Sequence, residues 1–213
     1  MISLSWKKRA AAAAVAVVMI AAGLTSCSGV QASVTLPGAS SSVTYKTNLA
    51  LTPAGETSSG CKTEYFFPRA GQQAQTRLIQ LINSSQKNLD MAIYSLTDPQ
   101  IASAVTNAHK RGVTVRILSD KQQSGGENQK AILSGFVKAG IPVKVNTHSG
   151  LMHLKVTIID RKVATTGSFN YTKSAETKND EVFVVLNDQK AAQDFESEFS
   201  TMWSGKGGFT NFK

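Results

Sequence analysis

Apolar residues follow two different periods between residues 61 and 205. Where every second residue is apolar the pattern predicts a strand, and where apolar residues recur three or four apart it predicts a helix. A clear helix start is Asp98, an N-cap residue directly before Pro99. The expected strands are 61–67, 88–95, 113–117, 142–145, 153–160, 162–166 and 181–186, and the expected helices are 72–85, 99–111, 127–139 and the segment after Asp188.

Strands that alternate with helices predict the α/β class, a layered sandwich with a mixed, mostly parallel sheet flanked by helices. The short connection at 160–162 predicts a hairpin, which makes the second half of the sheet antiparallel. A chain of 213 residues, 41% of them hydrophobic and without an internal repeat, is enough for one core. We therefore expect a single domain at 61–205 and a C-terminal tail at 206–213.

The N-terminus has the pattern of an export signal. A basic segment, 6–9, precedes a short apolar stretch, 10–24, which is too short for a comfortable transmembrane helix. The stretch ends in the residues 24–27, Leu-Thr-Ser-Cys, which resemble a bacterial lipobox. The resemblance implies that 1–26 is a lipoprotein signal peptide and that Cys27 is lipidated, so that the exported protein is anchored to a membrane surface. A plain signal peptide is the alternative.

Residues 27–60 combine this cysteine with a segment rich in Ser, Thr, Ala and Gly, and they are expected to form a flexible tether. Cys61 is a free thiol if Cys27 is lipidated, whereas the two could form a disulfide if it is not. Two cysteines and three scattered histidines give no zinc-type spacing, so neither a metal nor another cofactor is expected.

The charge balance of the chain is basic. The formal net charge is +9, and removal of 1–26 takes away Lys7, Lys8 and Arg9 and leaves +6. A basic surface favours anionic partners such as nucleic acid or acidic lipid headgroups, although a modest excess is equally typical of ordinary solubility.

Residues 153–170, HLKVTIIDRKVATTGSFN, contain the candidate chemistry. Because successive side chains of a strand point to opposite faces, His153 and Lys155 share one face, and Leu154, Val156 and Ile158 share the core face. The pattern therefore places an imidazole and an ammonium group side by side.

Further polar groups follow at strand ends. Ser168 and Asn170 come directly after Gly167, and Glu181 opens another strand. Together with the imidazole and the ammonium group they supply a nucleophile or base, a fixed cation, hydrogen-bond donors and a carboxylate. That combination suits a phosphodiester, whose nonbridging oxygens need a cation and donors.

The spacing His153-x-Lys155-x4-Asp160-x6-Gly167-Ser168-x-Asn170 resembles the phospholipase D superfamily signature, H-x-K-x4-D-x6-G-S-x-N, and matches it at every fixed position. The segments 66–68, 91–98, 108–120 and 179–185 are also similar to the small, single-motif endonuclease branch of this superfamily. The resemblance extends over essentially the whole domain, 61–205.

The resemblance implies a role for each residue of the pattern. His153 is the nucleophile that forms a phosphohistidine, while Lys155 and Asn170 hold the phosphate oxygens. Ser168 and Glu181 orient the imidazole, although Glu181 is alternatively an exposed acid at a strand edge. Asp160 belongs to the catalytic signature. Because side chains alternate along a strand, however, its side chain is expected on the face opposite to His153, which predicts a structural role such as pairing with a cation.

A chain with one such motif resembles enzymes that build one shared site by homodimerisation, in which one imidazole attacks and the other protonates the leaving oxygen. The resemblance implies a metal-independent phosphodiesterase, with an endonuclease on DNA or RNA favoured. The basic residues expected near the site are Lys121, Lys144, Arg161, Lys173 and Lys178. Two alternatives remain, a phospholipase D that cleaves phospholipid headgroups and a non-catalytic nucleic-acid-binding lipoprotein.

Overall fold

The computed structural model describes residues 31–34, 43–46 and 63–213. The chain divides into two units, Met1–Asn48 and Leu49–Lys213. In the first unit, β1 (Gln31–Val34) and β2 (Val43–Lys46) form an antiparallel pair within the segment predicted to be a tether, where no strand was expected. Cys27, Cys61 and the predicted signal peptide lie outside the described residues.

The second unit is built on an eight-stranded sheet with the strand order β10-β6-β5-β4-β7-β8-β9-β3. The pairs β4–β5 and β5–β6 are parallel, and the other neighbouring pairs in this sheet are antiparallel. The α/β class and the mixed sheet are confirmed, but parallel pairing is limited to β4–β6 instead of prevailing in the sheet. The strands are β3 (Thr63–Phe66), β4 (Asn88–Ile93), β5 (Thr114–Ser119), β6 (Val143–Asn146), β7 (Lys155–Ile159), β8 (Val163–Gly167), β9 (Phe183–Leu186) and β10 (Phe209–Asn211).

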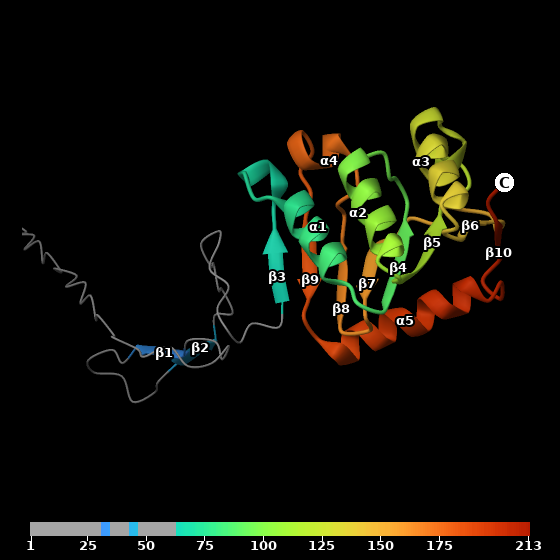
Figure 1. The fold of residues 1–213 in the computed structure, drawn as a ribbon. Helices are drawn as coiled ribbons and strands as arrows, with labels where there is room; N and C mark the ends of the chain where they lie inside the picture. Colours follow the sequence, from blue (N-terminus) through green and yellow to red (C-terminus); the bar gives the residue numbers. More distant parts are fainter. Residues whose placement is uncertain (1–30, 35–42, 47–62) are drawn as a thin grey trace, which may run out of the picture. The chain divides into compact units, whose positions relative to one another are not determined.

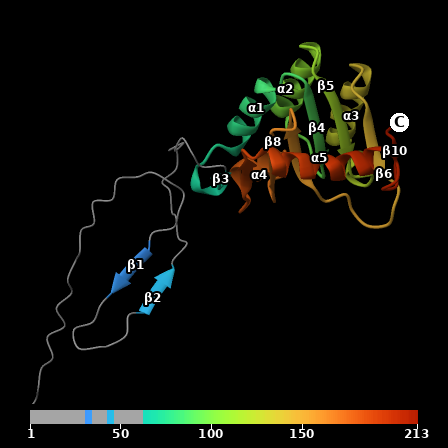
Figure 2. The same ribbon diagram turned by 90° about the horizontal axis from the view of Figure 1, so that it is seen from below.

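Helices lie on both faces of this sheet (Figures 1 and 2). Three of them, α1, α2 and α3, cover one face, and the long α5 runs across the other (Figure 1). The helices are α1 (Ala74–Ser84), α2 (Pro99–Lys110), α3 (Glu127–Lys138), α4 (Lys173–Thr177) and α5 (Gln189–Trp203), with short 3-10 helices η1 (Pro68–Ala70) and η2 (Gln123–Gly125). The expected N-cap is present, because the side chain of Asp98 accepts hydrogen bonds from the first turn of α2.

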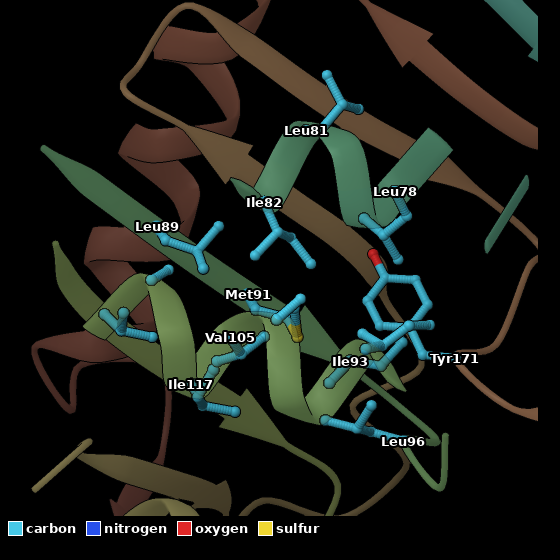
Figure 3. Packing of buried hydrophobic residues seen from close by; sticks show 14 of the residues in the cluster. Leu78, Leu81, Ile82, Leu89, Met91, Ile93, Leu96, Val105, Ile117 and Tyr171 are labelled. Carbon is cyan, nitrogen blue, oxygen red and sulfur yellow. The ribbon is translucent and has the colours of Figure 1, made fainter. Parts of the chain in front are cut away.

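The two faces of the sheet carry two separate cores. Met91 and Ile93 of β4 point into the larger one, where α1 and α2 contribute leucines, isoleucines and valines (Figure 3). Ala92, on the opposite face of the same strand, belongs to the smaller core with Ile158 and with Phe199 of α5. The alternation of side chains along the central strands therefore holds the helical layers on both sides.

The predicted hairpin joins β7 and β8. Asp160 and Arg161 both have a positive φ, 52° and 57°, and the N–H of Lys162 donates to the carbonyl of Ile159 at 2.9 Å. Two left-handed residues are typical of the tight turns that match the twist of antiparallel strands. The turn brings β8 back along β7, so that the end of β8 reaches the start of β7.

The C-terminal segment differs from its prediction. β10 lies in the expected tail, 206–213, but it pairs with β6 at the edge of the sheet, and Phe209 packs in the smaller core. A three-residue strand that directly follows Gly207 and Gly208 shows no alternation long enough to recognise. Within the described part of the chain, no helix is long and apolar enough to cross a membrane.

Candidate active site

Four residues of the signature, His153, Lys155, Ser168 and Asn170, lie at the side of the sheet where β7 starts and β8 ends, next to α4 (Figure 1). Because β8 runs antiparallel to β7 and to β9, the end of β8 lies beside the starts of the other two strands. His153 precedes β7, Ser168 and Asn170 follow β8, and Glu181 precedes β9. The topology thus brings together side chains that are up to 28 residues apart in sequence, counted from 153 to 181.

His153 and Lys155 lie in direct contact. The Nζ atom of Lys155 is 3.0 Å from Nδ1 and 3.1 Å from Nε2 of the imidazole, and it donates to the carbonyl oxygen of His153 at 2.8 Å. The imidazole is exposed, whereas Lys155 is 5% exposed. The site therefore presents an accessible ring nitrogen next to a nearly buried cation.

One detail of the strand prediction is wrong. β7 begins at Lys155, so His153 and Leu154 precede it, and the side chain of Leu154 is 40% exposed instead of lying in the core. Val156 and Ile158, which are inside the strand, are buried as expected. Strand parity holds only within the ladder, and the residues before its first pair are free to turn outward.

Tyr94 is a site residue that the sequence pattern did not single out. Its ring centroid lies 4.5 Å from that of the His153 imidazole, and the Nζ atom of Lys155 lies 4.9 Å from the Tyr94 ring centroid. The Tyr94 hydroxyl accepts a hydrogen bond from Gln123 at 3.1 Å. An aromatic face beside an ammonium group stabilises the cation, so one ring supports both catalytic candidates.

The pKa of Lys155 lies below the ordinary value of a lysine. Burial disfavours its charged form and lowers the pKa, while the negative charge of Glu181 acts in the opposite direction and raises it. Desolvation also strengthens the attraction between the ammonium group and an anion placed beside it.

Ser168 and Glu181 form a hydrogen-bonded pair. The Ser168 hydroxyl donates to one carboxylate oxygen of Glu181, and the Asn179 amide donates to the other at 3.1 Å. The N–H of Val182 in turn donates to the Ser168 hydroxyl at 3.1 Å. The carboxylate is thus held by Ser168 and Asn179, while the His153 ring is in contact with Lys155 and Tyr94.

Gly167 is what allows β8 and β9 to meet at this point. Its φ is 125°, and a Cβ atom there would lie 2.1 Å from the carbonyl oxygen of Val182. The same approach lets the N–H of Ser168 donate to that carbonyl at 3.0 Å. A side chain at 167 would push Ser168 away from Glu181.

Asn170 has an uncommitted polar atom. Its Oδ1 is buried and has no hydrogen-bond partner among the described residues, while Phe169 and Tyr171 on either side are fully buried in the core. A buried amide oxygen without a partner is destabilising, and buried polar atoms without a partner are uncommon in folded proteins. Rotation of the amide by half a turn exchanges this oxygen for the NH2 donor that a phosphate oxygen needs.

Asp160 lies just beyond the other end of β7, on the side of the sheet opposite to the site. The length of β7 separates it from Lys155, about 16 Å for five residues of strand. Its carboxylate accepts the N–H groups of Gln86, Lys87 and Asn88 at 2.7–2.9 Å. Partial burial raises its pKa, but these backbone hydrogen bonds lower it further, so the pKa lies below the ordinary value. Its hydrogen-bond partners are backbone amides, and the positive charge of Lys162 also lowers its pKa, in agreement with the nearby cation suggested from the sequence.

Two of the basic residues expected near the site lie elsewhere. Lys144 donates to the backbone of Trp203 on the α5 face, and Arg161 lies 3.6 Å from Glu196 at the same sheet edge as Asp160. Lys121 follows β5, and Lys173 and Lys178 follow β8, so these three lysines come after strands that end at the same side of the sheet as the site.

A hollow of about 640 Å³ adjoins the catalytic cluster. Ser168 and Glu181 belong to both, and the remaining lining residues are Phe67, Arg69, Ala70, Asp180 and Val182. No group of three or more His, Cys, Asp or Glu side chains that could hold a metal ion occurs in the part of the chain that the structure describes.

A mixed sheet with an imidazole, a lysine, an amide and a Ser–Glu pair at one edge defines a phosphodiesterase-type site. Residues 78–203 match the family model described as "Cardiolipin synthase, PLD-like domain". The chain therefore belongs to the phospholipase D-like family, which the sequence pattern predicted.

Individual relatives agree with this assignment. The chain is 33% identical over 144 residues to a mitochondrial cardiolipin hydrolase of Chlamydomonas reinhardtii and 37% identical over 130 residues to a phospholipase D of Rickettsia prowazekii. These matches cover 68% and 61% of this chain, and 64% and 62% of the two relatives. The chain thus spans less than two thirds of the length of these curated relatives.

Two solved structures are similar over nearly their whole length. Nuc of Salmonella typhimurium, a phospholipase D family member, has a TM-score of 0.66 and 32% sequence identity, and the match covers 71% of this chain and 97% of Nuc. NucT of Helicobacter pylori has a TM-score of 0.64 and 28% identity, and the match covers 71% of this chain and 99% of NucT.

Proposed function

We propose that this protein is a metal-independent phosphodiesterase that cleaves nucleic acid through a phosphohistidine intermediate. The observation that carries the proposal is the exposed imidazole of His153 with the buried ammonium group of Lys155 at 3.0 Å. Nucleophilic attack on a phosphodiester requires, above all, a nucleophile and a fixed positive charge.

The first step forms a covalent bond to the enzyme. A neutral ring nitrogen of His153 attacks phosphorus, the bond to the leaving oxygen breaks with its electron pair, and that oxygen takes a proton from an acid. Lys155 and the amide of Asn170 hold the nonbridging oxygens and stabilise their charge in the transition state. In the second step water attacks phosphorus and gives up a proton, and the P–N bond breaks, releasing a phosphate monoester and free imidazole.

The acid in this scheme is His153 of a second copy. One chain carries one signature, and a two-fold axis through the site brings two identical imidazoles to one phosphate. Exposed apolar side chains support such an arrangement, since Leu151 and Leu154 next to His153 are 48% and 40% exposed. A second copy that covers them would remove apolar surface from water.

Nucleic acid is favoured as the substrate by similarity and by charge. The match to Nuc and NucT covers these proteins almost completely. Residues 63–213 contain 18 Lys and Arg and 13 Asp and Glu, a net charge of 18 − 13 = +5, which attracts a polyanion.

Phospholipid is the second candidate substrate. The relatives named cardiolipin hydrolase and phospholipase D favour it, and an anchor at Cys27 would hold the domain at a lipid surface. A non-catalytic nucleic-acid-binding lipoprotein is the least favoured, because His153 and Lys155 are both present and in contact.

The decisive experiment compares substrates for the full-length protein in detergent. DNA, RNA and vesicles of cardiolipin or phosphatidylcholine are incubated with excess EDTA, with His153→Ala as the control for contaminating activity. Cleavage of nucleic acid that persists in EDTA is expected. If only phospholipid is cleaved, the second candidate function replaces the nuclease. If activity is lost in EDTA and restored by a divalent ion, the metal-independent mechanism is overturned.

We propose separately that Cys27 anchors the protein to a membrane, which the lipobox pattern supports. The exported protein would then lie at a membrane surface outside the cytoplasm. Cys27→Ala is expected to leave the precursor unprocessed or the product unanchored, with unchanged cleavage in solution. Equal retention of wild type and variant in membranes after a high-salt wash would overturn lipidation at Cys27.

A further inference from the structure

Two large aromatic side chains of the second unit are exposed without an evident structural reason. Tyr65 of β3 is 58% exposed and Phe67, just beyond the strand, is 48% exposed. Between them, Phe66 packs against the larger core. Of these two exposed rings only Phe67 lines the hollow that adjoins Ser168 and Glu181. An exposed phenyl ring next to a catalytic centre is a candidate contact for the substrate.

The segment that carries Phe67 is held in a fixed shape. The N–H of Phe67 donates to the side chain of Gln72 at 2.8 Å, and its carbonyl accepts the N–H of Ala70 at 2.9 Å. Pro68 begins η1, and Gly71 ends it in the left-handed conformation. The ring is therefore presented by a short rigid turn, which lowers the entropy lost when a ligand binds to it.

Arg69 places a guanidinium group at the same hollow. Its Nη1 donates to the carbonyl of Lys178 at 2.5 Å, and its Nε lies 3.3 Å from a carboxylate oxygen of Asp180. These two contacts orient the planar group, and its five N–H donors exceed what they use. An exposed, oriented guanidinium is suited to a phosphate.

The two carboxylates in the lining are already engaged. Asp180 pairs with Arg69, and Glu181 accepts hydrogen bonds from Ser168 and Asn179. A cationic lipid headgroup in this hollow would lie next to the guanidinium group of Arg69, and the two positive charges would repel each other. A flat, neutral ring followed by an anion meets no such repulsion, and this is the chemistry of a nucleobase and the next phosphate along a strand.

We propose that the hollow is a subsite for the nucleotide attached to the scissile phosphate, with its base stacked on Phe67 and the neighbouring phosphate bound by Arg69. The proposal rests on the proposed nuclease function and adds where, and through which residues, the strand is bound. A base can stack on a side chain only when it has left a duplex, so the subsite selects single-stranded nucleic acid.

The test measures how much the bases contribute to cleavage. The full-length protein is given a single-stranded oligonucleotide and a strand of the same length built from tetrahydrofuran abasic units, which keeps the phosphates and removes the bases. The ratio of kcat/KM for the two strands is compared among variants, since a ratio is not altered by a partly unfolded preparation.

The wild type is expected to prefer the strand with bases by roughly 5- to 150-fold, the range that one stacked base contributes. Phe67→Ala should remove most of that preference, and Phe67→Trp should keep it. The matched control is Tyr65→Ala, which deletes an equally exposed ring of the same segment outside the hollow and should leave the ratio unchanged.

Arg69→Gln should act on both strands, because both carry the phosphate. It is expected to lower kcat/KM for each and to reduce the slope of log(kcat/KM) against log[salt] by about 0.7, the value for one phosphate contact on a single strand. An unchanged slope would overturn the role of Arg69.

The failures are distinguishable. If the wild type cleaves nucleic acid but treats both strands alike, or if Phe67→Ala leaves the ratio unchanged, the subsite is overturned and the nuclease function stands. If the wild type cleaves no nucleic acid and hydrolyses phospholipid vesicles, the proposed function and the subsite are both overturned.

Discussion

Asp160 shares a sequence signature with His153 but not a location. It accepts three backbone hydrogen bonds at the opposite edge of the sheet and has a positive φ of 52°. Asn tolerates this left-handed conformation and removes only the charge. Asp160→Asn should therefore lower the free energy of unfolding at pH 7 by about 2 kcal/mol, and kcat should stay within about twofold, because the site lies about 16 Å away.

Denaturant unfolding of both proteins at several pH values checks the cause. Because the native pKa of Asp160 lies below its unfolded value, the carboxylate stabilises fully above the unfolded pKa, and this contribution is lost as the pH falls through the native pKa. Wild type and variant should thus converge in stability in acid. A well-folded Asp160→Asn protein as inactive as His153→Ala would contradict the structural role.

The pH dependence of catalysis should follow Lys155. Its ammonium form is required, so activity falls as the pH rises through its pKa, which burial places below the ordinary value of a lysine. Glu181 raises that pKa, so Glu181→Gln should lower it further and move the alkaline limb of log(kcat/KM) to lower pH. Asp180→Asn is the matched control, since this neighbouring carboxylate pairs with Arg69 and should leave the limb in place. A limb that stays or moves upward in Glu181→Gln contradicts the assignment.

At the scale of elements, the close approach of β8 and β9 depends on Gly167. A Cβ atom there would lie 2.1 Å from the Val182 carbonyl oxygen, so Gly167→Ala must separate the two strands and displace Ser168. We expect a loss of more than about 2 kcal/mol in unfolding free energy and a large loss of kcat. Gly112→Ala is the control, because Gly112 also has a positive φ, 92°, but nothing lies within 4 Å of its Cβ position. Equal losses in thermal melts and turnover of the two variants would show that backbone strain alone is responsible.

The length of an element decides whether its apolar pattern can be recognised in the sequence. Elements with several turns or pairs, such as α2 and β5, were predictable because their apolar periodicity is long. The helix α4, with five residues, and β10, with three, carry too short a period to detect. The strand order could not be predicted either, because alternation within one strand does not indicate its neighbour. The antiparallel pairing of β4 with β7 is an example.

Strand order in turn decides what was predictable in the site. His153, Lys155 and Ser168 follow from the spacing of the signature alone. Tyr94 reaches the imidazole because β4 lies beside β7, and Arg69 reaches the hollow because its partners Lys178 and Asp180 follow α4. Such contacts between distant segments are set by tertiary packing, and no local period encodes them.

At the scale of the whole molecule, the number of imidazoles per site is the open question that the single signature raises. The scheme needs one imidazole as nucleophile and one as acid. In a dimer with one shared site, a single His153→Ala chain leaves either the nucleophile or the acid but not both. A dimer of that kind should fail on a substrate whose leaving group needs a proton.

Refolding the wild type with an equal amount of His153→Ala protein tests this arrangement. Random pairing gives two intact chains in about a quarter of the dimers, so about a quarter of the DNA cleavage should remain, whereas independent sites would leave about half. Distinct affinity tags on the two chains verify that they have mixed. The mixed dimer, isolated through both tags, should recover partly on a nitrophenyl phosphodiester, because nitrophenolate leaves without protonation. Activity on DNA that is linear in the wild-type fraction, with mixing verified, would rule out the shared pair of histidines.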